Sequence, residues 1–238
     1  MLAVFKRDFK AYFTSAIGYI YLGAYIFVLN LIFYLNNALG ASASLAGVFS
    51  FMLLVMMFIT PILTMRVFSE DFKQKTDQLL FTSPVKLSGI VVGKYLSSLA
   101  VFVCLLLLTL LWPFAISFFG ENNIAEVVGN YAGILCIGSA YIAMGVFISS
   151  LTENQVVAAV GSLGLFVALY LLEVLPLVFF QSTLPAFVMR ALYFFSIFGR
   201  YSSITRGVLA LDDIVYFLSI SAVFLFLTVR GLEKRRWA

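Results

Sequence analysis

Charged and apolar residues are separated along this chain into long blocks. Residues 11–65 carry no charged side chain, and neither do residues 95–120. The stretch between them, Arg66–Lys94, holds five of the fifteen Lys and Arg residues and three of the eleven acids. A helix needs about 20 apolar residues to cross a bilayer, so each charge-free block is long enough for at least one span. The pattern predicts a polar segment in water between two membrane-inserted blocks.

The same reading along the whole chain predicts six membrane-spanning helices, separated by turns where small and polar residues gather. They are expected at residues 16–35, 48–65, 95–119, 131–151, 156–175 and 214–229. Residues 1–14 place apolar and charged side chains on opposite sides of a helix, which is typical of a helix lying on the membrane surface. The chain is therefore predicted to be a single all-α integral membrane domain over residues 1–238.

The region after the fifth predicted span does not have the pattern of another span. Pro176 and Pro185 are expected to break it, and the apolar pieces that follow are too short to cross a bilayer. Residues 177–206 are predicted to form short helices in the outer leaflet or a re-entrant segment.

Composition supports a membrane protein. The chain is 63% hydrophobic and only 11% charged, whereas a soluble domain carries about 25% charged residues. Its apolar residues form long charge-free runs and not the short alternating segments of a membrane β-barrel, so the spans are predicted to be helices.

The distribution of Lys and Arg predicts the orientation. The N-terminus, the 66–94 segment, the 152–155 turn and the C-terminus together hold twelve basic residues, and the opposite side holds three. Basic residues concentrate on the cytoplasmic side of membrane proteins. Both termini are therefore predicted to be cytoplasmic in a multi-pass protein of the cell membrane.

The sequence lacks the residues that common catalytic sites require. It contains no histidine, which excludes a Ser–His pair and the usual zinc protease motifs. No G-x-x-x-x-G-K-[ST] phosphate loop occurs, so the chain is not expected to hydrolyse ATP itself. No spacing typical of a metal site is present. The chain is predicted not to be an enzyme.

Candidates for function remain in the 69–83 segment and at a few positions within the spans. Residues 69–83 are predicted to form a short amphipathic helix, and its mixed charges favour a protein partner over anionic lipid or nucleic acid. Within the spans, Asn30 either bonds a neighbouring helix or faces a substrate path. Glu173 either ends a helix or lines an exit path, paired with Arg190 or Arg200. Gly138 and Gly145 belong to a small-residue face that favours close helix contact.

The order SEDFKQKTDQLLFTSPVKLSGIVVGKY is similar to the segment between spans 2 and 3 of ABC-2 type permeases, the membrane subunits of type V ABC exporters. Lys75 stands where that pattern usually has glycine, and Gln78 where it usually has glutamate. The C-terminal region around Asp212–Asp213 resembles the gliding-motility and copper-enzyme-maturation branch of the family. The residues that match the pattern of the first segment are Glu70, Thr76, Leu79, Leu80, Pro84, Gly93, Lys94 and Tyr95.

The resemblance implies a membrane-spanning permease subunit of an ATP-driven exporter. It implies two copies of a separate ATPase subunit, which would bind the ATP and Mg, and a second permease that is identical or homologous. The helix after span 2 would be the coupling helix, and the segment between spans 5 and 6 would gate the exit. The coupling residues would then be Glu70, Asp71, Phe72, Lys75, Thr76, Asp77, Leu79, Leu80 and Pro84. Two other hypotheses stay open at this point, a non-transporting anchor or regulator that recruits a cytoplasmic protein and a secondary transporter.

Overall fold

The computed structural model describes residues 1–39, 45–76, 86–117, 124–179, 197, 200–201 and 211–237. Within these ranges every secondary-structure element is a helix, and six helices are long and apolar enough to cross a membrane. The predicted all-α fold with six spans is therefore confirmed.

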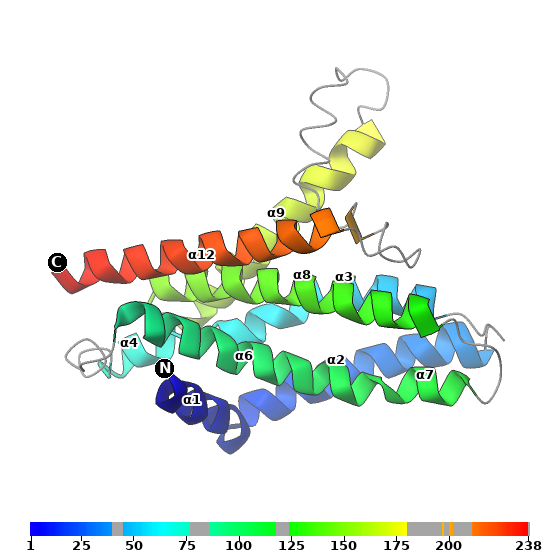
Figure 1. Ribbon diagram of the computed structural model, residues 1–238, viewed down its shortest axis with the longest axis horizontal. Helices are drawn as coiled ribbons and strands as arrows, with labels where there is room; N and C mark the ends of the chain where they lie inside the picture. The colour runs from blue at the N-terminus through cyan, green and yellow to red at the C-terminus, as the bar shows by residue number, and fades with distance from the viewer. Residues whose placement is uncertain are drawn as a thin grey trace.

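The helices follow the predicted order. Helices α2, α3, α6, α8 and α12 run along one another in a bundle, whereas α9 leaves it at an angle (Figure 1). The two chain ends and the short helix α4 lie toward the same end of the bundle. The elements are α1 (Leu2–Thr14), α2 (Ala16–Phe33) continued by the π-helical segment η1 (Tyr34–Leu39), α3 (Ala46–Thr64), α4 (Ser69–Lys73), α6 (Leu87–Thr109), α7 (Leu111–Ile116), α8 (Ile124–Leu151), α9 (Gln155–Phe179) and α12 (Leu211–Trp237).

Four helices extend well beyond the bounds that the charge pattern predicted. Helix α8 begins at Ile124, although the span was expected at residues 131–151, because Glu126 lies in its first turn, where an acid favours a helix N-terminus. Helix α6 begins at Leu87 and carries Lys94 inside it, because the charge of Lys94 is compensated within the protein. Helix α9 continues through Pro176 to Phe179 and is not broken there, since membrane helices tolerate proline when neighbouring groups satisfy the freed carbonyl. Helix α12 continues through its basic end to Trp237, where cations favour a helix C-terminus. Of the predicted outer-leaflet segment after α9, the structure describes only Ile197, Arg200 and Tyr201.

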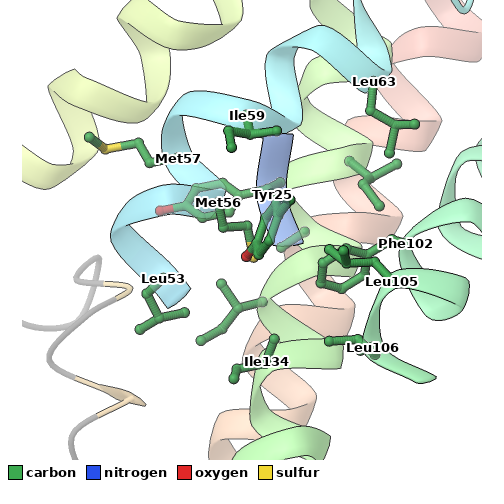
Figure 2. Close-up of a cluster of buried hydrophobic side chains, with 14 of the residues drawn as sticks. Tyr25, Leu53, Met56, Met57, Ile59, Leu63, Phe102, Leu105, Leu106 and Ile134 are labelled. Carbon is green, nitrogen blue, oxygen red and sulfur yellow. The ribbon is translucent and has the colours of Figure 1, made fainter. Parts of the chain in front are cut away.

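The core of the bundle lies where α8 and α3 meet their neighbours. Figure 2 shows Tyr25 of α2 pointing among side chains of α3, α6 and α8. Tyr25, Met56, Leu63, Phe102 and Ile134 are each fully excluded from solvent. Apolar side chains gain no hydrophobic drive from leaving lipid, so this packing stabilises the bundle through van der Waals contact.

Two glycines of α8 allow the closest helix approaches. A Cβ atom at Gly145 would lie 2.2 Å from the Thr64 hydroxyl oxygen of α3, and one at Gly138 would lie 2.1 Å from the Phe102 ring of α6. No side chain fits at either place. The small-residue face predicted for this span therefore sets the distance from α8 to both α3 and α6.

Candidate functional site

Six charged side chains gather where α1, α4 and α6 meet, at the end of the bundle that holds both termini (Figure 1). They line a cavity of about 360 Å³ together with neutral residues such as Tyr12 and Thr76. We call this set the charge cluster, and it consists of Arg7, Asp8, Arg66, Glu70, Asp71 and Lys94. The charge cluster holds three positive and three negative side chains. They come from three segments that are far apart in the sequence.

Lys94 of α6 is the centre of the charge cluster. It is 3% exposed, and its ammonium nitrogen lies 2.6 Å from Asp71 Oδ2 and 3.1 Å from Asp8 Oδ2. It also donates a hydrogen bond to the Val67 carbonyl oxygen at 2.6 Å. A buried ammonium is tolerated only when it is paired and hydrogen-bonded. The Lys94 triad, defined as Asp8, Asp71 and Lys94, therefore joins α1, α4 and α6.

Further contacts attach α1 to the bundle. The Tyr12 hydroxyl donates to the Leu63 carbonyl oxygen at 3.0 Å and lies 2.9 Å from Ser98 Oγ. Burial raises the pKa of Tyr12, so this hydroxyl stays protonated as a donor. At Gly93 a Cβ atom would lie 3.0 Å from the Met1 carbonyl oxygen, so α1 packs directly on the α6 backbone.

Side chains from α8 and α12 hold α4 from the other side. Ser149 Oγ of α8 accepts the backbone N–H groups of Phe68 and Ser69 at 3.1 and 3.2 Å, which satisfies donors at the start of α4. Phe72 is 4% exposed, and the Arg235 guanidinium of α12 lies 4.0 Å above its ring. Arg235 also forms an ion pair with Glu153 in the α8–α9 turn. Helix α4 is thus fixed by four other parts of the chain.

Helix α4 ends at Lys73, whereas the sequence pattern predicted one helix over residues 69–83. The backbone N–H of Thr76 donates to the Asp71 carbonyl, and that of Lys75 to the Phe72 carbonyl. This pair of backbone hydrogen bonds is typical of a helix C-terminus that ends in a residue with left-handed backbone. Lys75 has that conformation, with φ 58°. Lys75 and Thr76 therefore lie in a turn. The predicted coupling residues Asp77, Leu79, Leu80 and Pro84 lie outside the described residues.

The structure separates the predicted coupling residues into internal and external ones. Phe72 is buried, Asp71 belongs to the Lys94 triad, and Glu70 accepts a hydrogen bond from Arg66 Nη2 at 2.6 Å. The exposed residues at this place form the α4 outer face, which we define as Lys73, Gln74 and Lys75. Sequence reasoning included only Lys75 of these three. It also missed Asp8, although a lone acid among the basic residues of an amphipathic helix is a signal for an internal partner.

The residues predicted for a substrate path or gate lie elsewhere. Asn30 Oδ1 accepts a hydrogen bond from the Trp112 indole at 2.8 Å, which joins α2 to α7. Arg200 forms an ion pair with Asp213 at 3.1 Å, and its guanidinium lies 4.2 Å above the Tyr216 ring. Glu173 lies in α9 and its side chain is outside the described part, as is Arg190. A substrate path through these residues stays a prediction.

Residues 5–149 match the family described as ABC-2 family transporter protein. The match covers more than half of the chain and includes the whole charge cluster. The chain belongs to the ABC-2 transporter family. Membership makes it a multi-pass membrane protein and implies the permease role in an ABC transporter, with ATP hydrolysis on another subunit. No curated protein matches this ABC-2 chain. Among the described residues, no group of Cys, Asp and Glu side chains is placed to hold a metal ion.

Replacing Lys75 with glycine is expected to stabilise this ABC-2 protein by up to about 1 kcal/mol. The backbone of Lys75 is left-handed, and a side chain there is strained while glycine is not. The free energy of unfolding, measured in detergent with a chemical denaturant, checks this. The neighbouring Gln74→Gly variant is the control. Gln74 is exposed and has an ordinary φ of −87°, so glycine relieves no strain there. The Gln74→Gly protein is therefore expected to lose stability, because glycine gives the unfolded chain more freedom. Equal effects of the two variants would contradict a specific strain at Lys75.

Proposed function

We propose that this chain is the permease subunit of an ATP-driven exporter and that its separate ATPase subunit docks on the α4 outer face. The observation that supports this most is the placement of α4. It is a short helix beyond the apolar part of α3, its inner side is buried, and its outer side presents Lys73, Gln74 and Lys75 to solvent.

A docking element must pass a movement of its partner to the spans. Helix α4 meets this requirement because its inner side is tied to several helices at once. The Lys94 triad connects it to α1 and α6, Ser149 connects it to α8, and Arg235 connects it to α12. A push or pull on the α4 outer face would therefore act on the bundle and would not be absorbed by a loose loop.

The proposal places the α4 outer face in the cytoplasm, where ATP is available. The side that holds α1, α4, the α8–α9 turn and the end of α12 carries twelve of the fifteen basic residues, which favours a cytoplasmic location. Both termini are then cytoplasmic. We further propose an assembly of two permeases, identical or homologous, with two ATPase subunits that bind ATP and Mg, within the gliding-motility and copper-enzyme-maturation branch.

Capture of the partner tests this proposal. The tagged full chain, purified in mild detergent from its own cells, is expected to retain a chain that contains a phosphate loop, identified by mass spectrometry. The double variant Lys73→Glu/Lys75→Glu is expected to retain at least about tenfold less of that chain, since reversed charges at a contact weaken binding by more than 1.4 kcal/mol. The variant Lys234→Glu, which reverses an exposed lysine of α12, is the matched control and is expected to retain it fully.

Two outcomes would contradict the proposal. Capture of a partner without a phosphate loop would favour the membrane anchor or regulator. Equal capture by wild type and by Lys73→Glu/Lys75→Glu would show that the ATPase docks elsewhere.

A further inference from the structure

The outward side of α1 presents a pair of cations. Lys6 and Lys10 are both exposed and lie one turn apart, so they share one side of the helix. The acid of this helix, Asp8, points inward to Lys94. The outer surface of α1 is therefore basic, although the helix as a whole contains both signs of charge.

A row of aromatic rings lies beside this cationic pair. The Phe5 and Phe9 ring centroids are 5.8 Å apart, and those of Phe9 and Phe13 are 5.1 Å apart. Successive residues of a helix turn by about 100°. Lys6 and Lys10 thus lie on the side that faces away from α6, next to the aromatic row. With the aromatic row in the boundary of the acyl chains, both ammonium groups lie at the level of the lipid phosphates.

The charge of this surface selects the kind of lipid. A zwitterionic headgroup offers an ammonium as well as a phosphate, and the outward side of α1 has no acid to pair with that ammonium. An anionic headgroup matches two exposed lysines, and the Arg7 side chain next to them is 48% exposed. Basic residues near an anionic membrane surface each strengthen binding by roughly fivefold.

The Lys94 triad connects this surface to α4. Asp8 on α1 and Asp71 on α4 share the ammonium of Lys94, at 3.1 and 2.6 Å. Arg7 reaches the same Asp71 oxygen at 3.6 Å. A lipid contact that fixes α1 at the surface therefore restricts α4 through two ionic contacts.

We propose that α1 binds anionic phospholipid through Lys6 and Lys10 and that this binding holds α4 in place through the Lys94 triad. The consequence for ATPase docking rests on the proposed function, whereas lipid binding and its effect on α4 do not. The permease would then couple to its ATPase better in an anionic leaflet than in a neutral one.

Hydrogen exchange of the α4 backbone tests the proposal without any ATPase. The full chain is reconstituted in vesicles of phosphatidylcholine alone and in vesicles that also contain phosphatidylglycerol. In wild type, exchange over residues 69–73 is expected to be several-fold slower with phosphatidylglycerol. The Lys6→Gln/Lys10→Gln variant is expected to lose this difference and to bind phosphatidylglycerol roughly thirtyfold more weakly.

Two further variants keep the test specific. Lys6→Arg/Lys10→Arg preserves both charges and is expected to behave as wild type. Lys234→Gln removes an exposed charge of α12 and is also expected to behave as wild type. The proposal is overturned if wild-type α4 exchanges equally in both vesicles, or if Lys234→Gln weakens the phosphatidylglycerol effect as much as the α1 double variant does. If α4 exchanges more slowly with phosphatidylglycerol than without it, and the chain captures no ATPase, the lipid contact is supported. Only the proposed function is then contradicted.

Discussion

The Lys94→Met variant is expected to lose about 3–5 kcal/mol of unfolding free energy. Methionine fills nearly the same volume, so the loss comes from charge and not from packing. Without the ammonium, the two carboxylates of low exposure, Asp8 and Asp71, are left to share the half-exposed Arg7, and the Val67 carbonyl loses its donor. The contacts of α1 and α4 with α6 would weaken together, because all three elements share this one cation.

Denaturant unfolding in detergent measures this loss, and two variants control it. Lys86→Met removes an exposed lysine just before the same helix, and its effect is expected to stay within about 0.5 kcal/mol. Combining Lys94→Met with Asp8→Asn and Asp71→Asn removes the buried charges together and is expected to recover much of the loss. If Lys94→Met were no more destabilising than Lys86→Met, the triad would not hold α1 and α4.

Replacing Gly145 with leucine is expected to cost about 1–3 kcal/mol or more through overpacking. The first atom of the new side chain would lie 2.2 Å from Thr64 Oγ1. Thr64 is fully buried, and its hydroxyl donates to the Thr60 carbonyl at 3.3 Å within α3. The threonine cannot turn away, so α3 and α8 must separate, and the position of α4 directly after α3 would shift with them.

The smaller Gly145→Ala variant is expected to show the same loss in weaker form, which keeps the measurement possible if the leucine variant does not fold. Gly231→Ala in α12 is the control, since nothing lies within 4 Å of the added Cβ. Alanine favours a helix over glycine by about 1 kcal/mol, so that variant is expected to gain stability. The unfolding temperature in detergent distinguishes Gly145→Ala from Gly231→Ala. A rise in this temperature for Gly145→Ala as well would contradict the close contact of α3 and α8.

The sequence predicts most of the fold because membrane spans follow from long apolar runs alone. The ends of the spans are predicted less well, for a physical reason that Lys94 illustrates. The sequence rule treats every charge as a sign of water, whereas a charge compensated by partners lies inside a helix. Pro176 shows the same effect for a helix breaker, since α9 continues past it.

The site is predicted only in part, because its residues meet through tertiary contacts. The mixed charges after span 2 indicate a functional segment, yet no spacing rule joins Asp8 to Lys94 or Arg235 to Phe72. Lys75 is the exception. The resemblance predicts glycine at this position, and the left-handed backbone of Lys75 is a conformation that favours glycine.

The rate of ATP hydrolysis by the assembled complex tests most directly whether the α4 outer face carries the ATPase contact. The captured ATPase is measured alone and with wild-type, Lys73→Glu/Lys75→Glu or Lys234→Glu permease in the same vesicles. Wild type and Lys234→Glu are expected to stimulate hydrolysis equally, and the double variant is expected to leave the rate near that of the ATPase alone. Full stimulation by the folded double variant would contradict docking on the α4 outer face.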